Sequence, residues 1–241
     1  MVYVSFARFL HAFVAATLSS LSTATLARDI GWHDRIESRI EALALLQSLN
    51  ADLLSHDSAT LTLDRWCRAH RLASSSLIFA DLLRNDTKAA TEEQRAVLGV
   101  SPDVPVNYRH VRLRCGDRVL SEAENWYVPS RLTPEMNRTL ETSDIAFGRA
   151  VKALRFQRHT LSAELLWSPL PEGWEIGAAL PMESDAPLPV PDHVIRHRAV
   201  LVLPDGTPFS EVIENYTSDV LAIPEPHLSP TQATSPVIPA K

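Results

Sequence analysis

The sequence predicts an α+β fold in which helices cover one side of a mostly antiparallel sheet. A helical pattern lies near the start of the chain, strand-like runs joined by tight turns fill the later part, and two short helices interrupt those strands after the first hairpin. Helices followed by antiparallel strands are typical of this class. With 241 residues, 45% of them hydrophobic, the chain is long enough for one domain with a sizeable core.

Two helices are expected before the first strands. Apolar residues spaced by three, four or seven positions predict an amphipathic helix over 36–53. The segment 53–60 is rich in side chains that hydrogen-bond local backbone, so we expect a turn there, and a second helix from Leu63 to about His70. The residues that form the first pattern are Ile36, Ile40, Leu43, Leu46 and Leu53.

Three further helices are expected from their capping residues. Gln94 follows Thr91 by three positions, which is a capping box and predicts a short helix. Thr133-Pro134-Glu135 has the cap, the proline and the acid of a helix start. We expect Asp144 to cap a last helix over 145–154.

The strands are predicted from aromatic and β-branched runs between turns. The runs 108–115 and 119–128 flank Gly116-Asp117 and predict a hairpin. Pro204-Asp205-Gly206-Thr207 predicts the turn of a second hairpin. Its strands are expected at 199–203 and 209–221, and further strands at 161–167 and 176–180.

The two ends of the chain differ from the domain between them. Arg8 precedes a charge-free run from Phe9 to Ala27 that ends in small residues, which predicts a signal peptide over 1–27. An amphipathic first helix or a membrane tether is the alternative. A single domain is expected over 28–222, and a disordered proline-rich tail over 223–241. We expect a periplasmic or secreted protein, or a cytoplasmic one if the N-terminus is not a signal.

Composition and motif spacing exclude several classes of function. The net charge of −6 excludes a basic nucleic-acid surface. The seven glycines form none of the spacings used by dinucleotide sites, P-loops or nucleophile elbows. Cys67 and Cys115 lack metal-type spacing, and His193 and His197 lack the glutamate of a zinc motif. We therefore expect no metal and no cofactor. The two cysteines are either a disulfide in an exported protein or two small core residues.

Two charged residues lie on strand faces that are otherwise apolar. Arg109 shares a face with Val111 and Leu113, and Glu214 shares one with Val212 and Tyr216. A lone buried charge costs several kcal/mol unless a partner or ligand compensates it. The two residues are therefore either a structural pair or the polar ends of a pocket. The opposite face of the first strand carries His110, Arg112 and Arg114 and is expected to be solvated.

Each candidate also has a plain structural explanation. Arg109 could reach solvent from the strand end, and Glu214 could pair with a buried arginine. Phe147-Gly148-Arg149 could form an anion site at a helix start or simply pack. The polar residues Glu122, Glu124 and Asn125 are explained equally well by exposure on an edge strand.

The order of several segments resembles the chorismate pyruvate-lyases. The segments are Leu53-Leu54 with Asp57-Ser58 and Thr60, the hairpin 108–129, Ile145-Ala146-Phe147-Gly148-Arg149, Gly206-Thr207-Pro208 and Val212-Ile213-Glu214-Asn215-Tyr216. The resemblance extends from about Leu45 to Leu221. It implies a chorismate lyase-like sheet of about six antiparallel strands, helices over an enclosed site for an aromatic acid, no cofactor, and elimination of pyruvate from chorismate to give 4-hydroxybenzoate.

The resemblance also implies roles for individual residues. Arg109 matches the arginine that holds the ring carboxylate if one residue is inserted in the hairpin, and His110 falls there without the insertion. Glu214 matches the glutamate at the opposite end of the ligand. Phe147 and Gly148 match the helix-start segment, and Val111 lies on the ligand-facing side of the strand. Arg109 and Glu214 are thus the expected catalytic residues.

The chain departs from the family pattern at Ala59, where a larger apolar residue is usual, and in a longer segment between Trp167 and His197. The same fold resembles effector-binding domains of bacterial transcription regulators, which bind small ligands without reacting them. The alternative function is thus a non-catalytic binding protein of the cell envelope. In both cases we expect a monomer whose partner is a small aromatic or cyclic carboxylic acid.

Overall fold

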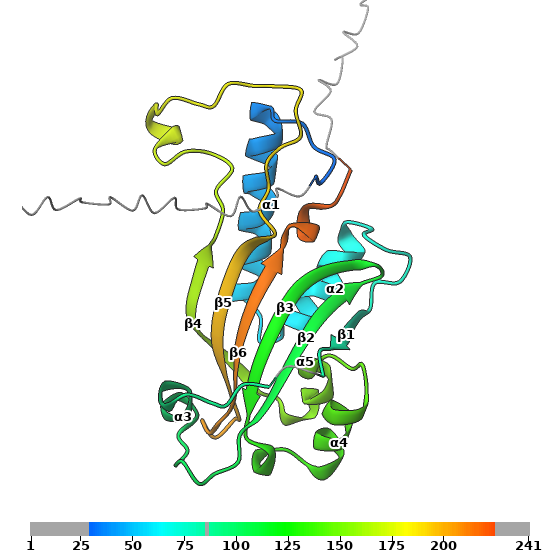
Figure 1. Ribbon diagram of the computed structural model, residues 1–241, viewed down its shortest axis with the longest axis vertical. Coiled ribbons are helices and arrows are strands. Elements are labelled where there is room, and N and C mark those ends of the chain that lie inside the picture. Colours follow the sequence, from blue (N-terminus) through cyan, green and yellow to red (C-terminus); the bar gives the residue numbers. More distant parts are fainter. Residues whose placement is uncertain (1–28, 85–86, 225–241) are drawn as a thin grey trace, which may run out of the picture.

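The computed structural model describes residues 29–84 and 87–224. Its centre is one six-stranded antiparallel sheet with the strand order β1-β2-β3-β6-β5-β4 (Figure 1). The predicted α+β class with about six antiparallel strands is confirmed. The strands are β1 (Ile78–Leu82), β2 (Asn107–Cys115), β3 (Arg118–Tyr127), β4 (Gln157–Leu165), β5 (His193–Val202) and β6 (Pro208–Thr217).

Three of the helices begin where a capping side chain satisfies one of their first backbone N–H groups. Ser58 caps α2, Thr91 forms the predicted capping box of α3 with Gln94, and Thr133 caps α4. α1 covers the range predicted for it. The helices are α1 (Ile36–Leu54), α2 (Ala59–Ala69), α3 (Glu92–Leu98), α4 (Pro134–Thr142) and α5 (Phe147–Ala150).

Most of the core lies between the helices and one face of the sheet, called the inner face below. α1 and α2 lie behind the sheet in Figure 1 and bury Leu46, Leu63 and Trp66 together with strand residues such as Leu113 and Tyr216. A second cluster lies under α4 and α5 and contains the buried rings of Tyr127, Phe147, Phe156 and Phe209. The cavity described below lies on this inner face.

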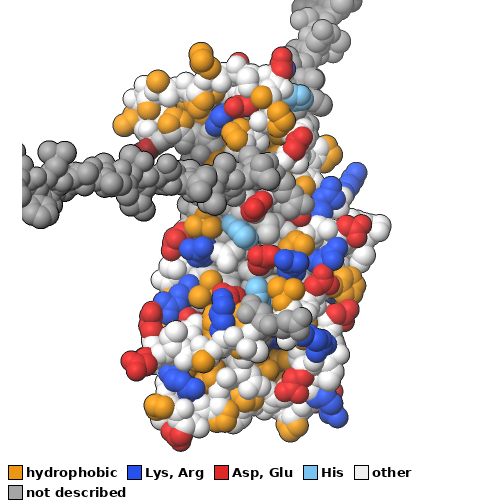
Figure 2. All heavy atoms as spheres, in the orientation of Figure 1, with side chains coloured by type: hydrophobic (Ala, Val, Ile, Leu, Met, Phe, Trp, Pro, Cys, Tyr) orange, Lys and Arg blue, Asp and Glu red, His pale blue; other side chains and the backbone are white. Residues whose placement is uncertain are grey.

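The opposite, outer face is charged over much of its area. Arg112 pairs with Glu122 at 2.9 Å, and Arg114 pairs with Asp81 at 2.8 Å, both across neighbouring strands. In Figure 2 basic and acidic side chains lie side by side across the middle of the visible face. The predicted solvated face of β2 is thus a set of exposed ion pairs. α3 covers a small apolar cluster beside it, with Leu98, Trp126 and Val128.

A disulfide joins α2 to the end of β2. Cys67 and Cys115 are fully buried, with their Cα atoms 6.1 Å apart, and form an S–S bond. Of the two alternatives that the sequence left open for these residues, the structure has the disulfide. The disulfide bond links α2, one of the helices that cover the sheet, to β2, the strand that carries Arg109.

One strand prediction is wrong, and one strand was not predicted. No strand forms at 176–180, where a short 3-10 helix (Trp174–Ile176) lies between Gly173 and Gly177, both in the left-handed region with φ of 76° and 97°. Two left-handed glycines so close together cannot belong to a continuous strand. β1 was not predicted, because it is five residues long and only Ile78 and Ala80 are buried.

Several boundaries also differ from prediction. α2 starts at Ala59 instead of Leu63, β4 starts at Gln157, and β5 starts at His193. Asp144 does not cap a helix over 145–154. The helix there is the four-residue α5, its N-cap position is Ala146 with no side-chain bond, and a 3-10 turn (Lys152–Leu154) follows.

The predicted signal peptide, 1–27, and most of the predicted tail lie outside the described residues. Within 29–84 and 87–224, no helix combines the length and apolar character needed to cross a membrane. Near the end of this range the carbonyl of Ile223 accepts a hydrogen bond from the Trp32 indole at 2.9 Å. The two ends of the described chain are therefore joined.

We predict that the Cys67→Ala/Cys115→Ala variant is less stable than the wild type. The bond closes a loop of 48 residues, and the entropy that it removes from the unfolded chain amounts to about 4 kcal/mol. Urea unfolding of both proteins measures the difference. Wild type unfolded in the presence of a reductant should match the variant, and a loss below about 1 kcal/mol would contradict the prediction.

Candidate functional site

A cavity lies between the inner face of the sheet and the segments that begin α2 and α5. It has an empty volume of about 470 Å³, part of which is open to solvent. Its walls are Asp57, Ser58, Ala59, Thr60, Arg109, Val111, Leu113, Ala123, Asn125, Phe147, Gly148, Phe156, Arg158, Leu201, Val212 and Glu214.

Strand register brings the polar wall residues to one face. Arg109 pairs with Asn125, which pairs with Val212, and Glu214 lies two residues further along β6. Because side chains alternate along a strand, all of these point to the inner face. The Cα atoms of Arg109 and Glu214 are two strand spacings and two residues apart, about 12 Å. The two charges therefore lie in different parts of the cavity wall and do not form a salt bridge.

Arg109 is a buried cation with only 4% of its surface exposed. Its Nε donates to the carbonyl of Leu140 at 3.2 Å, and its Nη2 to the carbonyl of Ile145 at 3.0 Å. Within the described chain, no carboxylate lies within ion-pair distance of its guanidinium. Burial lowers the pKa of Arg109 to about 10, so the group stays cationic at neutral pH. The structure thus resolves the choice between Arg109 and His110, since Arg109 faces the cavity.

Glu214 pairs with an arginine that the sequence analysis did not identify. Arg158 of β4 donates from Nη2 to Oε2 of Glu214 at 2.6 Å, and the side chains are 3% and 7% exposed. Tyr216 donates its hydroxyl to the same oxygen at 3.1 Å. Among the described residues, Oε1 of Glu214 and Nε of Arg158 have no hydrogen-bond partner. Oε1 is therefore the acceptor that Glu214 can offer to a ligand.

The charges of this pair support each other. Burial acts to lower the pKa of Arg158, but the adjacent Glu214 carboxylate outweighs burial and raises it. For Tyr216, burial and the Glu214 charge together raise the pKa well above its ordinary value. Arg158 therefore stays charged, and Tyr216 stays a neutral donor, at any physiological pH.

His197 extends this polar group away from the cavity. It pairs with Glu214 in the β5–β6 register, is fully buried, and its Nε2 lies 2.8 Å from Oδ1 of Asn50. Its Nδ1 has no partner among the described residues. Burial lowers the pKa of His197 to about 4, so the ring is neutral at pH 7. Because Nε2 faces a carbonyl oxygen, we assign the proton to Nε2.

The starts of α2 and α5, called the cover below, close the cavity on the side opposite the sheet and approach each other closely. A Cβ atom on Gly148 would lie 2.7 Å from Oγ of Ser58 and 3.2 Å from Oγ1 of Thr60. Any larger residue would force the two segments apart. Gly148 is thus needed for this approach, and it lines the cavity beside Phe147 as the resemblance implied.

A bidentate ion pair holds the same cover on the sheet. Nη2 of Arg149 lies 3.0 and 2.9 Å from the two carboxylate oxygens of Asp64 in α2. Asp64 also accepts a hydrogen bond from the backbone N–H of Ile78 in β1 at 2.8 Å. One carboxylate therefore connects α2, α5 and the first strand.

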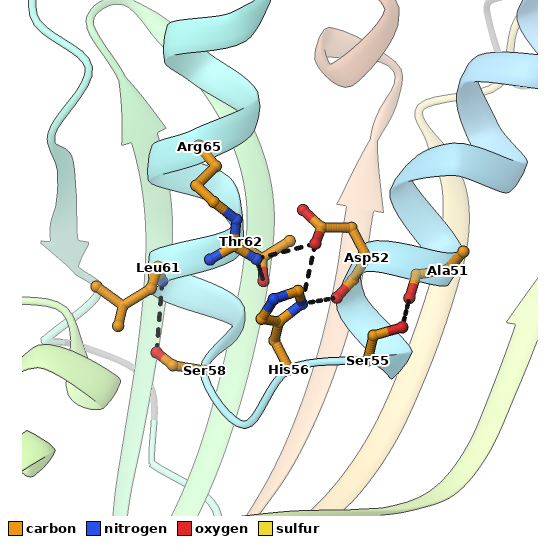
Figure 3. A network of polar contacts seen from close by, with 8 residues as sticks. All are labelled: Ala51, Asp52, Ser55, His56, Ser58, Leu61, Thr62 and Arg65. Atoms are coloured by element: carbon orange, nitrogen blue, oxygen red, sulfur yellow. Dashed lines mark hydrogen bonds and ion pairs between the residues drawn. The ribbon is translucent and has the colours of Figure 1, made fainter.

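The turn between α1 and α2 is fixed by a second polar network, shown in Figure 3. Oδ1 of Asp52 lies 2.9 Å from both Nδ1 of His56 and Nη2 of Arg65. Ser58 caps α2 by accepting from the N–H of Leu61. The cavity residues 57–60 follow directly, so this network positions them.

The structure brings all five predicted site residues, Arg109, Val111, Phe147, Gly148 and Glu214, to one cavity. Asn125 is buried there too, and the explanation by edge exposure is wrong because β3 lies inside the sheet, between β2 and β6. Glu122 and Glu124 lie on the outer face, where Glu124 contacts Lys88 and Tyr108. Sequence reasoning missed Arg158, whose strand has a polar sequence.

The described residues contain no group of three or more His, Cys, Asp or Glu side chains placed to hold a metal ion. The cavity instead offers two guanidinium groups, two carboxylates, two hydroxyls and an amide among apolar and aromatic side chains. Such a wall can bind and orient a small organic anion.

Comparisons with known proteins give one strong match. No protein-family model matches the chain. The chain is 58% identical over 200 residues to "Uncharacterized protein y4mC" of Sinorhizobium fredii. This alignment covers 83% of this chain and 84% of that protein.

Solved structures are much more distant. The effector domain of PhnF from Mycobacterium smegmatis has a TM-score of 0.44 at 15% identity, over 68% of this chain and 90% of that one. A GntR-family transcriptional regulator from Enterococcus faecalis has a TM-score of 0.38 at 12% identity, over 58% and 93%. Both TM-scores lie below 0.5, so neither likeness assigns a ligand to this chain.

We predict that His197 makes the protein less stable in mild acid. In the unfolded chain this histidine takes up a proton near pH 6.5, but in the folded protein only near pH 4. The contribution of neutral His197 to the free energy of unfolding is fully present above pH 6.5. It falls as the pH drops from 6.5 to 4, by up to about 3 kcal/mol. Urea unfolding at pH 7 and pH 4.5 measures the loss.

His197→Gln should remove most of this pH dependence, whereas the same change at the half-exposed His193 of β5 should leave it in place. An unchanged pH dependence in His197→Gln would contradict the assignment.

Proposed function

We propose a function for this chain, which belongs to the family of the uncharacterized protein y4mC of Sinorhizobium fredii, from the chemistry of its cavity. The protein binds a small aromatic or cyclic monocarboxylic acid between Arg109 and Glu214. Arg109 pairs with the carboxylate, and Oε1 of Glu214 accepts a hydrogen bond from a polar group at the opposite end of the ligand.

The single observation that carries this proposal is the unbalanced charge of Arg109. A buried guanidinium bonded only to carbonyl oxygens still lacks a counter-charge, and burying an unpaired ion is costly. A ligand carboxylate would supply that charge and accept the donors that Arg109 has left.

The remaining wall supports a flat or cyclic ligand. Phe147 and Phe156 line the cavity with Val111, Leu113 and Val212. Phe147 is held in place by rings on either side, 5.6 Å from Tyr127 and 6.4 Å from Phe209 between centroids. Rigid aromatic walls favour ring-shaped ligands through contact area and stacking.

The charge balance favours a monoanion. Arg158 and Glu214 neutralise each other and Asp57 is exposed to solvent, so the buried part of the wall has a net charge of +1, from Arg109. One carboxylate balances that charge. A dianion would have to compete with Glu214 for Arg158.

We predict that 4-hydroxybenzoate raises the melting temperature of the protein, because a ligand selective for the folded state stabilises it by mass action. Arg109→Met should weaken binding about ten- to a hundred-fold, the value of one charge-assisted hydrogen bond. Isothermal titration calorimetry measures both affinities. Arg112→Met, on the outer face of the same strand, is the matched control and should bind like the wild type.

Equal binding by wild type and Arg109→Met would contradict the proposal. So would the absence of any melting-temperature shift with 4-hydroxybenzoate, benzoate and cyclohexene carboxylates.

A second candidate is elimination of pyruvate from chorismate, and the free Oε1 of Glu214 is the observation that favours it. In that reaction the bond between the ring and the ether oxygen breaks, the ring carbon that bears the hydroxyl loses its proton as the ring becomes aromatic, and the departing enolpyruvate takes up one proton to become pyruvate. A carboxylate beside the ring end that carries the hydroxyl and ether groups could take part in the proton transfer. Arg109 would hold the ring carboxylate, as the resemblance to chorismate pyruvate-lyases implies.

Incubation of the protein with chorismate tests this candidate. If it is a lyase, 4-hydroxybenzoate absorbance should rise above the uncatalysed rate, and Glu214→Gln should lower the rate about 10²- to 10⁴-fold. Arg158 would lose its counter-charge in this variant, so a thermal melt must accompany the assay. Product formation at the uncatalysed rate alone would exclude turnover and leave binding as the function.

The disulfide supports the export predicted from the N-terminal sequence. Disulfides persist in oxidising compartments and are rare elsewhere. We therefore propose that the protein binds its ligand in the cell envelope. Cell fractionation tests this location, and recovery of the protein with reduced cysteines in the cytoplasmic fraction would contradict it.

A further inference from the structure

Asn125 lies beside Arg109 on the wall of the cavity. The two residues are direct partners in the β2–β3 register, both side chains are on the inner face, and they are 5% and 4% exposed. Opposed residues on one face of an antiparallel pair have Cβ atoms about 4.5–5.5 Å apart. The side chains of Asn125 and Arg109 thus leave adjacent strands side by side, and both line the cavity.

A buried serine determines which end of the Asn125 amide is free. The hydroxyl of Ser210, in β6, donates to Oδ1 of Asn125 at 2.7 Å, and Ser210 is fully buried. Within the described chain the amide nitrogen, Nδ2, has no protein hydrogen-bond partner. The oxygen is therefore used inside the protein, while the two N–H donors of Nδ2 are left at the cavity wall.

A purely structural asparagine in this position would satisfy both ends of its amide. Ala123 and Val212 beside it offer no side-chain acceptor, and among the described residues neither Tyr127, Ser210 nor Glu214 on the same face accepts from Nδ2. A buried N–H without an acceptor is destabilising. The arrangement is explained if a ligand supplies the acceptor.

We infer that Asn125 and Arg109 together form a clamp for the ligand carboxylate, with Ser210 as the positioning residue that orients the Asn125 amide. This inference rests on the proposed function and adds a second residue to its binding site. Arg109 supplies charge, and Asn125 supplies neutral donors from the adjacent strand. A carboxylate can accept from both because it has two oxygens and no hydrogen to donate.

The clamp predicts a preference between two ligands of nearly the same shape. Benzoate presents acceptors only, whereas benzamide presents one acceptor and an NH2 group that would face the donors of Asn125 or Arg109. Wild type should therefore bind benzoate more tightly than benzamide. Asn125→Asp turns the donors into an acceptor with a negative charge, so it should reverse this order.

Calorimetric titration of the full chain with benzoate and with benzamide tests the inference. Asn125→Leu, which keeps the size and removes the donors, should weaken benzoate binding about ten-fold or more. Ser210→Ala should weaken it less, because the amide remains but is no longer oriented. Unchanged benzoate affinity in Asn125→Leu, or tighter binding of benzamide by the wild type, would overturn the clamp.

A ligand-free measurement separates this inference from the proposed function. The carboxylate of Asn125→Asp would stand where the ligand carboxylate binds, so it should pair with Arg109. Thermal melts of Asn125→Asp, Arg109→Met and the double variant form a double-mutant cycle. We expect Asn125→Asp to cost at least about 2–4 °C more when Arg109 is absent.

The two possible failures can be told apart. Additive melting temperatures would overturn the neighbourhood of Asn125 and Arg109. Benzoate binding by the wild type together with unchanged affinity in Asn125→Leu would overturn the clamp while the proposed function stands. If the melting temperatures in the cycle are not additive but the wild type does not bind benzoate, the pairing of these residues would be supported and the proposed function contradicted.

Discussion

The site contains two buried arginines whose positive charges are shielded from water. Each charge is compensated in a different way. Arg158 has a full counter-charge in Glu214, with a hydrogen bond from Tyr216 to the same carboxylate. Arg109 has only the carbonyls of Leu140 and Ile145. Those carbonyls belong to the end of α4 and the connection to α5, so the charge of Arg109 also holds this connection over the sheet. Carbonyls near a helix C-terminus suit a cation because their dipoles point toward it.

The cover over the cavity is a single connected unit for related reasons. α2 is bound to α5 through Asp64 and Arg149, to β1 through the N–H of Ile78, and to β2 through the disulfide. Gly148 lets the two segments approach until no Cβ atom would fit between them. A ligand that fills the cavity would thus touch residues from α2, from α5 and from the sheet at once. Binding energy gathered from three such elements stabilises the fold as a whole, which is why a melting temperature reports on occupancy.

Local pattern was enough to predict the part of the site that lies on regular strands. Alternation placed Arg109 and Glu214 inward, and the turn residues gave both hairpins. It was not enough for Arg158, because β4 is an edge strand with mostly polar residues and no apolar alternation. Asn125 was identified as an unexpected polar residue, but edge exposure explained it equally well. Only the topology separates the two explanations, since β6 pairs with β3 across more than 80 residues of sequence and no short-range pattern encodes this pairing.

The geometry around Glu214 weighs more strongly for binding than for chemistry. Oε2 of Glu214 already accepts from the buried guanidinium of Arg158 and from the phenol of Tyr216. Glu214 is thus used as the counter-charge of Arg158, and its Oε1 remains as a hydrogen-bond acceptor for a ligand. Arg109 and Asn125 would then hold one end of a cyclic acid while Oε1 of Glu214 selects a hydroxyl at the other. Under this proposal the cavity would discriminate between ligands by the placement of its donors and acceptor, and this discrimination would require no reaction.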